Sequence, residues 1–177
     1  MELANVINSR ASIRAYTDTP VTREQLDVLM KAAVRAPNAG NMQSWHFYAI
    51  CDKEVIDGFQ DKVLHIGWIK ETSLIIVVCI DENIVEKLTE MCGDRGRMFA
   101  HQDSAAAIEN ILLTATDLGL GACWMGPMNV EQCKIHAGMP ENHNPVAILT
   151  IGNPAQNPAP RGRKTMEEAV TMIGELK

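Results

Sequence analysis

The chain has 177 residues, 46% of them hydrophobic and 21% charged, and its formal net charge is -6. These values are typical of one globular domain over residues 1–177, and the acidic balance argues against nucleic acid as a general partner. The N-terminus lacks the pattern of a secretion signal and the longest apolar run, residues 74–80, is too short to cross a membrane, so we expect a cytoplasmic protein without a membrane partner.

The first predicted elements are a helix and a strand. Thr22 and Gln25 have the spacing of a capping box, and the apolar residues after them recur at helical intervals. Pro37 closes this helix, because the residue before a proline avoids the helical region. Residues 45–51 are rich in aromatic and apolar side chains and are typical of a strand.

The next predicted elements alternate between helix and strand. Residues 54–66 indicate a helix that Gly58 weakens, and residues 82–91 indicate a shorter one. Between them, residues 74–80 form a continuous apolar run. Such a run is expected of a strand that is covered on both faces.

A long helix is predicted to begin at Asp103 as its N-cap, to run to about Leu118 and to end at Gly119. Apolar side chains leave little of its circumference polar, and such a helix must be buried on all sides. Two arrangements satisfy this pattern. The helix is either shared across a dimer interface or buried within a single subunit.

The last third of the chain contains two more predicted strands, residues 122–125 and 146–151. The proline-rich residues 154–160 cannot join a central strand and indicate an extended arm. A final helix is predicted over residues 165–176. Helices and strands therefore alternate along most of the chain.

Two basic clusters lie at opposite ends of this acidic chain. Arg10 and Arg14 flank Ser12 near the start, and Arg161 and Arg163 lie near the end, each cluster in a stretch free of Asp and Glu. Guanidinium groups with a nearby hydroxyl suit a phosphate. On charge alone, two solvated basic termini explain the pattern equally well.

The loop between the first helix and the first strand is rich in Asn and Gly. Its Asn38, Gly40 and Asn41 adopt left-handed backbone angles readily, and most such loops are ordinary turns. Asn41 and Gln43, however, carry carboxamides that both donate and accept hydrogen bonds. The edge of a planar heteroaromatic ring requires groups of this kind.

The glycines of residues 119–127 do not form a dinucleotide fingerprint. The third glycine position holds Trp124, and the segment leads from a helix into a strand rather than the reverse. No phosphate-loop or nucleophile-elbow motif occurs. The five cysteines and five histidines lack ligand spacing, so we expect no metal site.

Four segments, in this order and at these separations, resemble the nitroreductase family of FMN-dependent oxidoreductases. The resemblance covers about residues 5–170. The segments are Arg10-Ala-Ser12-Ile-Arg14, residues 36–45 (Ala-Pro-Asn-Ala-Gly-Asn-Met-Gln-Ser-Trp), residues 117–126 (Asp-Leu-Gly-Leu-Gly-Ala-Cys-Trp-Met-Gly), and Ile151-Gly152-Asn-Pro154 leading to Arg161-Gly-Arg163-Lys164.

The resemblance implies a homodimer of α+β subunits, each a single FMN-binding domain with a central mixed β-sheet and an extended C-terminal arm. FMN would lie at the dimer interface. Arg10, Ser12 and Arg14 would reach its phosphate, ribityl chain and pyrimidine edge. Arg161 and Arg163 would complete the phosphate site.

The ring system of FMN would be contacted by the remaining two segments. Asn38, Ala39 and Asn41 would come from the partner subunit, with Gln43 beside the ring. A second set of residues would pass the flavin: Trp124, Met125 and Gly126, with the Gly126 N–H facing the N5/O4 side of the ring.

Three features depart from the family pattern. Family members commonly have Ser in place of Asn38 and Pro in place of Ser44. Nothing in residues 65–70 matches securely the Asn and Lys with which larger members contact the pyrimidine. The chain is also short, and residues 91–101 are expected to be what remains of the substrate lid, with Arg95 and Arg97 solvated rather than steering an anionic substrate.

The activity implied is hydride transfer from NADH or NADPH to the flavin, followed by reduction of a small planar acceptor such as a nitroaromatic or quinone, in a ping-pong mechanism. No side chain is required as acid, base or nucleophile. Two alternatives stay open: a specialised flavin enzyme of the same fold, a dehalogenase or flavin-converting enzyme, and a non-catalytic flavin- or nucleotide-binding protein.

Overall fold

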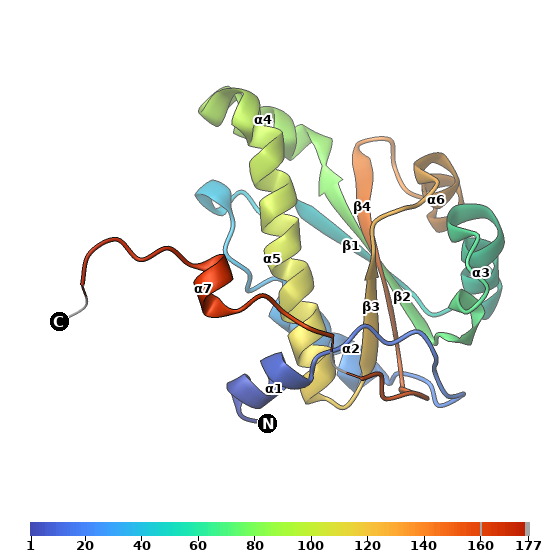
Figure 1. Ribbon diagram of the computed structural model, residues 1–177. Helices are drawn as coiled ribbons and strands as arrows, with labels where there is room; N and C mark the ends of the chain where they lie inside the picture. Colours follow the sequence, from blue (N-terminus) through green and yellow to red (C-terminus); the bar gives the residue numbers. More distant parts are fainter. Residues whose placement is uncertain (160, 176–177) are drawn as a thin grey trace.

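The computed structural model describes residues 1–159 and 161–175 and shows an antiparallel sheet between two layers of helices (Figure 1). The four strands are β1 (Trp45–Ile50), β2 (Leu74–Asp81), β3 (Gly121–Met125) and β4 (His143–Gly152). Their order across the sheet is β1-β2-β4-β3, and all three neighbouring pairs are antiparallel.

The sheet is antiparallel and not mixed, so this part of what the family resemblance implied was wrong. The one parallel contact in the described part of the chain is an isolated bridge between Ser12 and Ala122, at the edge of the sheet. The strand β4 begins earlier than predicted and includes Pro145. A register shift between Val78 and Cys79 of β2 accommodates this proline, which cannot donate to a regular ladder.

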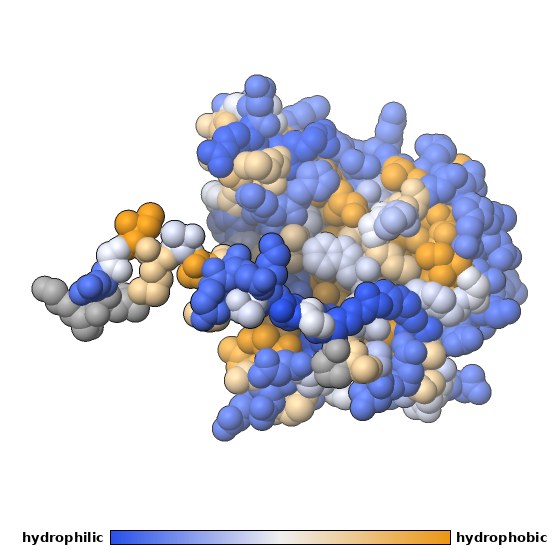
Figure 2. All heavy atoms as spheres, in the orientation of Figure 1, coloured by the Kyte–Doolittle hydropathy of each residue, from blue (hydrophilic) through white to orange (hydrophobic). Residues whose placement is uncertain are grey.

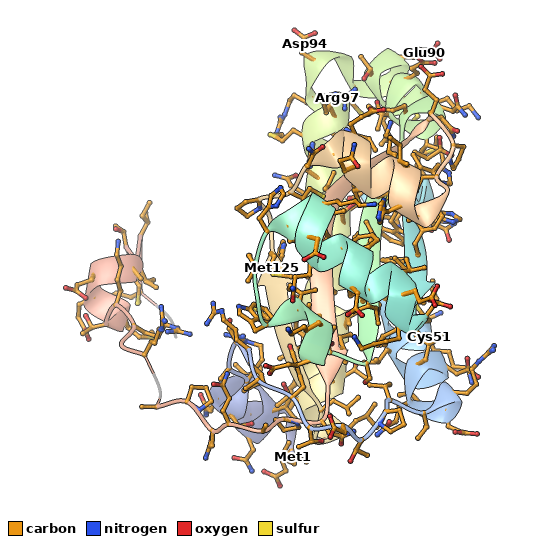
Figure 3. All side chains as sticks on the ribbon, turned by 90° about the vertical axis from the view of Figure 1, so that its right-hand side faces the viewer. Met1, Cys51, Glu90, Asp94, Arg97 and Met125 are labelled. Carbon is orange, nitrogen blue, oxygen red and sulfur yellow. The ribbon has the colours of Figure 1, made fainter. Side chains whose placement is uncertain are left out.

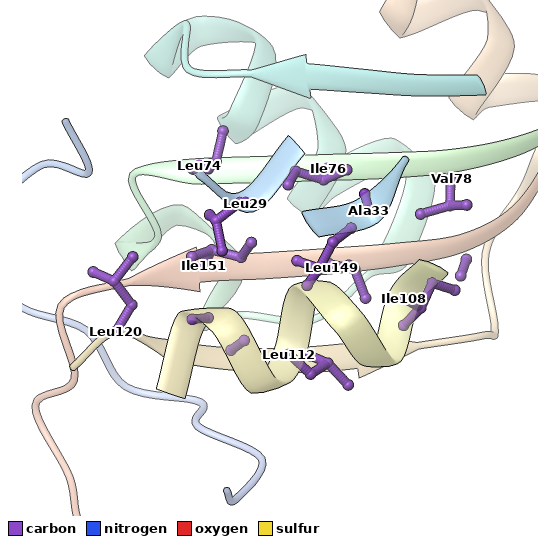
Figure 4. Packing of buried hydrophobic residues seen from close by; sticks show 14 residues of the cluster. Leu29, Ala33, Leu74, Ile76, Val78, Ile108, Leu112, Leu120, Leu149 and Ile151 are labelled. Atoms are coloured by element: carbon purple, nitrogen blue, oxygen red, sulfur yellow. The ribbon is translucent and has the colours of Figure 1, made fainter. Parts of the chain in front are cut away.

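One face of the sheet is covered by α2 (Arg23–Ala33) and α5 (Gly96–Asp117). The capping box predicted at Thr22 and Gln25 is present at the start of α2. Apolar residues of both helices pack on alternate residues of β2 and β4, as Figure 4 shows. The cluster includes Leu29, Ala33, Ile108, Leu112, Ile76, Val78, Leu149 and Ile151.

The other face of the sheet is covered by α3 (Lys53–Gly58), the π-helix η2 (Phe59–Leu64), the short η3 (Ile69–Glu71) and α6 (Val130–Ala137). The predicted helix 54–66 therefore changes to a π-helix after Gly58 and ends at Leu64. Gly58 permits close packing, because a Cβ there would lie 2.6 Å from the ring of His136 in α6. The sequence analysis did not predict α6.

The long helix begins at Gly96, seven residues before the predicted N-cap Asp103, so that prediction was wrong. Residues 91–101, expected to be what remains of the substrate lid, form the end of α4 (Glu82–Cys92), η4 (Gly93–Arg95) and the start of α5. Gly96 brings the two helices together, since a Cβ there would lie 2.4 Å from the Thr89 nitrogen. The extra turns of α5 bury Ala100 against α4.

The termini lie outside the three layers. A helix not predicted from the sequence, α1 (Leu3–Ser9), packs near the end of α5, and the predicted final helix is reduced to α7 (Met166–Ala169). Every described residue of 161–175 is exposed, so nothing in the described chain packs against a longer helix there. Residue 176 lies outside the described residues. No described helix is both long and apolar enough to span a membrane.

Candidate functional site

The N-terminal segment 10–17 is fixed between the edge of the sheet and the chain that leaves β4. The Ile13 N–H donates to the Ala122 carbonyl of β3 at 2.9 Å. Farther along, the Thr17 N–H donates to the Asn153 carbonyl at 2.8 Å. These bonds bring the first and last thirds of the chain side by side.

Tyr16 and Ile13 anchor this segment through their side chains. The Tyr16 hydroxyl lies 2.8 Å from both the Ile13 carbonyl and the Thr150 hydroxyl, and burial raises its pKa far above the ordinary value. Ile13 packs on Gly121, where a Cβ would lie 2.7 Å from it. The sequence analysis missed both residues, although the polar–apolar–polar order of residues 12–14 signals a strand with one buried position.

The two basic clusters line one pocket of about 510 Å³. It is formed by the end of α1, the N-terminal segment and the arm after β4, where a hydrophilic band crosses the molecule in Figure 2. Five residues of the two clusters are among its lining, Arg10, Ser12, Arg14, Arg161 and Arg163, whereas Lys164, the last residue of the second cluster, is not. The clusters are therefore one positively charged site.

The guanidinium groups of this pocket are not neutralised by carboxylates. Four ion pairs occur among the described residues, and none involves an arginine of the pocket. The Arg163 guanidinium donates instead to the carbonyls of Arg161 and Gly162, both at 3.1 Å. An anion entering the pocket would meet four cations that have no competing acid.

Arg14 lies at the inner end of the pocket, next to β3. Its guanidinium is beside the Cys123 thiol, where it partly offsets the effect of burial, which raises the pKa of that thiol. The Arg14 guanidinium is thus held close to the strand that leads to Trp124. The basic cluster and the residues at the end of β3 are therefore neighbours in space.

The residues at the end of β3 have different exposures. Met125 is buried, whereas Trp124 is 43% exposed on the opposite face of the strand; Figure 3 labels Met125 at the side of the sheet. Gly126 is exposed, and a Cβ there would meet nothing within 4 Å. A flat ligand could therefore approach the backbone of residue 126. None of the three residues lines the basic pocket.

The predicted ring-binding loop is not part of the pocket of its own chain. Asn38, Ala39, Asn41 and Gln43 lie in and around the short helix η1 (Ala39–Asn41), and none of them lines the pocket. Figure 1 shows this loop near the α4 end of α5, whereas α1 and the N-terminal segment lie near the other end.

The loop has a strained backbone. Asn41 and Gln43 have φ angles of +55° and +52°, and Gly40 between Ala39 and Asn41 has +57°. Non-glycine residues in this region cost free energy and persist where the surroundings enforce them. The Asp103 carboxylate of α5 contributes here, since it accepts the Ala39 N–H at 3.0 Å.

Arg97 is exposed, as the sequence analysis expected, but it also pairs with Glu82 through both terminal guanidinium nitrogens, at 2.9 and 2.6 Å. It lies at the far end of the molecule with Glu90 and Asp94 (Figure 3). Arg95 lies over the Phe99 ring at 5.1 Å. In the part of the chain that the structure describes, no three His, Cys, Asp or Glu residues are arranged to hold a metal ion.

Comparison with known proteins identifies similar chains. The sequence model of the Nitroreductase family matches residues 7–153. A Methanothermobacter thermautotrophicus protein, named as a candidate NADH dehydrogenase/NAD(P)H nitroreductase, is 33% identical over 165 residues, which cover 91% of this chain and 82% of that protein. An FMN reductase [NAD(P)H] of Bacillus subtilis is 27% identical, with 94% of this chain and 71% of the relative covered.

A solved structure with a similar fold carries a flavin. The crystal structure of a candidate nitroreductase from Desulfovibrio desulfuricans in complex with FMN is 26% identical and has a TM-score of 0.82. The match covers 98% of each chain.

Proposed function

The chain belongs to the nitroreductase family, and from this premise we propose that it is an FMN-dependent oxidoreductase that takes hydride from NADH or NADPH and reduces a small planar acceptor. The observation that carries the proposal is the basic pocket, in which residues from both ends of the chain meet without any acidic partner. The FMN reductase among its relatives and the FMN complex of similar fold support the same cofactor.

The pocket suits the phosphate of FMN. Arg10, Arg161 and Arg163 supply guanidinium donors and Ser12 supplies a hydroxyl, which together can satisfy the oxygens of a phosphate dianion. Without an anion these like charges would repel one another. We assign these four residues to the phosphate.

The inner end of the site suits the ring system. Arg14 lies beside Cys123, and its fixed positive charge would favour a reduced ring with negative charge at its pyrimidine edge. The exposed backbone N–H of Gly126 has open space beside it and would face the N5/O4 side. The backbone of Trp124 and Met125 would pass along the same side of the ring, since their side chains lie on opposite faces of β3.

A second copy of the chain would complete the site. Asn38, Ala39, Asn41 and Gln43 lie away from their own pocket, so we propose that they reach the ring of the flavin bound by the partner. The exposed arm after β4 would clasp that partner. In this homodimer the partner would also cover the outer face of α5, where Met98 is 40% exposed.

When FMN is bound, it supplies the redox chemistry by accepting and passing on hydride. The residues of this chain then have three tasks: to bind the phosphate, to orient the ring, and to tune its electron affinity through nearby charge. Nicotinamide and acceptor would stack in turn on one face of the flavin, which predicts ping-pong kinetics.

An anaerobic half-reaction tests the proposal. The purified protein should bind FMN with about one flavin per subunit, and excess NADH or NADPH should bleach the flavin absorbance near its visible maximum before any acceptor is added. A nitroaromatic or quinone should then restore the colour. Flavin that stays oxidised under both nicotinamides would contradict the reductase and leave a non-catalytic flavin-binding protein.

A further inference from the structure

The structure gives α5 a role at the loop 38–43 that the family comparison does not mention. Asp103 lies inside this helix, 6% exposed, and its Oδ1 accepts the Ala39 N–H at 3.0 Å. We propose that Asp103 is a positioning residue of the flavin site, which holds the loop in the conformation that the partner's flavin requires. This inference rests on the proposed function.

The bond from Asp103 ties the tip of the loop to α5, whereas the tip's other hydrogen bonds lie within the loop, among them the Met42 N–H to the Ala39 carbonyl at 3.0 Å. Within the loop, the Asn38 Oδ1 accepts the Gln43 N–H at 2.8 Å and closes a ring of six residues. The positive φ angles of Asn41 and Gln43 lie inside this ring. Asn adopts a positive φ readily but Gln does not, so the conformation of Gln43 needs support from the surrounding contacts.

The stem of the loop is fixed by the same face of α5. Ala36, before the loop, and Trp45, after it, are both buried against Ala107, one helical turn beyond Asp103. The helix thus holds the stem by apolar packing and the tip by a carboxylate. Side chains four residues apart on a helix share a face, so one rigid element sets the position of the whole loop.

The side chains of Asn41 and Gln43 make few hydrogen bonds within their own chain. Asn41 and Gln43 are exposed, and their only side-chain hydrogen bond among the described residues is a long one, from Gln43 Nε2 to the Asn41 carbonyl at 3.4 Å. The tip is held by its own hydrogen bonds and by α5, and it carries two oriented carboxamides that are free to bind an external partner. The edge of a flavin ring has matching donors and acceptors.

The use of a carboxylate at residue 103 also needs an explanation. Its second oxygen, Oδ2, is buried and has no hydrogen-bond partner among the described residues, and burial raises the pKa of the group. A buried carboxyl group with one oxygen lacking a hydrogen bond lowers the stability of the folded protein, and an aliphatic residue would avoid this loss. The hydrogen bond from the Ala39 N–H is the one role of this carboxylate that the described residues show.

The test compares replacements that differ in reach and in hydrogen-bonding ability. Asp103→Leu removes the acceptor and keeps the branching at Cγ with a bulkier side chain, and Asp103→Ser keeps a smaller polar group that is too short for the loop. Asp103→Asn keeps an oxygen for the Ala39 N–H. Ser104→Ala is the matched control, because Ser104 is 1% exposed and its hydroxyl bonds only within α5, to the Ala100 carbonyl at 2.9 Å.

The readouts are the dissociation constant for FMN, measured by quenching of its fluorescence, and the melting temperature of the FMN-free protein. Loss of a hydrogen bond of about 1–3 kcal/mol corresponds to weakening of roughly 5- to 150-fold. We expect this loss for Asp103→Leu and Asp103→Ser. We expect Asp103→Asn and Ser104→Ala to bind FMN within about threefold of the wild type.

A purely structural role would give another pattern, in which FMN affinity follows the melting temperature across all four variants. If Asp103→Leu and Asp103→Ser bind FMN like the wild type, the inference is overturned. Should one of them fail to fold, the other decides the question. A wild-type protein that binds no FMN would instead remove the proposed function, so the two failures are distinguishable.

Mixed dimers test whether the loop acts on the partner. Asp103→Leu is coexpressed, under a second tag, with a chain that carries Arg10→Ala and Arg163→Ala. In the hybrid, one site combines the intact pocket of the first chain with the intact loop of the second. We expect one tightly bound FMN per hybrid dimer; none would contradict an action across the interface.

Discussion

The ring of Tyr16 lies directly against Gly152, where a Cβ would approach the Cδ1 atom to 2.8 Å. Position 152 is the last residue of β4, and Tyr16 holds the segment that carries Ser12 and Arg14. Because residue 152 has no side chain, the Tyr16 ring can pack directly on the end of β4. This contact sets the position of the segment with Ser12 and Arg14, which forms one wall of the basic pocket. The packing of this pair links the core to the site.

Gly152→Ala should displace Tyr16 and disturb the pocket. Crowding of this kind typically costs about 1–3 kcal/mol of unfolding free energy. We expect a lower melting temperature together with weaker FMN binding. Gly67→Ala is the matched control, because a Cβ at residue 67 meets nothing within 4 Å and the φ angle there is not positive. Equal behaviour of the two variants would contradict the packing argument.

The phosphate assignment predicts that Arg10→Ala combined with Arg163→Ala loses FMN while the fold is kept. A hydrogen bond to a charged group contributes about 1.5–3 kcal/mol, so each replacement should weaken binding roughly 10- to 150-fold. Equilibrium dialysis measures the loss, and circular dichroism checks the fold. Arg23→Ala is the control, since Arg23 is exposed and pairs with Asp27 on α2. Stoichiometric FMN in the double variant would refute the assignment.

Thiol labelling should separate the five cysteines into two classes. Cys51 and Cys92 are exposed, whereas the other three are buried. Burial raises the pKa of the Cys79 and Cys133 thiols to about 12, and the thiolate is the reactive form. Ellman's reagent should therefore modify two thiols quickly in the native protein and five in denaturant. Fast modification of Cys51→Ser, Cys92→Ser protein would contradict this burial.

The pair between Glu82 and Arg97 predicts a pH-dependent stability. The hydrogen bonds from Arg97 lower the pKa of Glu82 in the folded protein, so the unfolded chain binds more protons in the acid range. The stabilisation is complete above the unfolded pKa, about 4.3, and is lost as the pH falls through the lower folded value.

Arg97→Ala should therefore reduce the unfolding free energy at pH 7 by about 0.2–1 kcal/mol, because the pair is partly exposed. The difference from the wild type should disappear as the pH is lowered past the folded pKa of Glu82. Urea denaturation at a series of pH values measures it. Arg23→Ala, which breaks a more exposed pair, should change stability less. A difference that grows in acid would contradict the pairing.

The proposed homodimer gives the arm after β4 a role that can be tested. Met172 is 67% exposed and Ile173 97% exposed, and Figure 2 shows apolar atoms on this arm away from the body of the chain. Met172→Asp combined with Ile173→Asp should weaken the homodimer and, with it, FMN binding. Analytical ultracentrifugation measures the first effect. Ile135→Asp, at a residue 61% exposed on α6, should leave the dimer intact.

The sequence predicted most of the core elements because their signals are local. The capping box at Thr22, the apolar run of β2 and the glycine after α5 depend on neighbouring residues alone. It missed α1 and α6, and it placed the start of α5 at Asp103. In that case a good capping residue was present, but its carboxylate serves a different element.

The sequence by itself determined which groups could hold a phosphate, because an acid-free pair of arginine clusters is visible in the order of residues. Only the tertiary structure decided that both clusters line one pocket and that the loop 38–43 lies elsewhere. The physical reason is that side-chain chemistry is a local property. The meeting of residues 10 and 163 depends on hydrogen bonds and packing between distant segments, such as those from Tyr16 to Thr150 and Gly152.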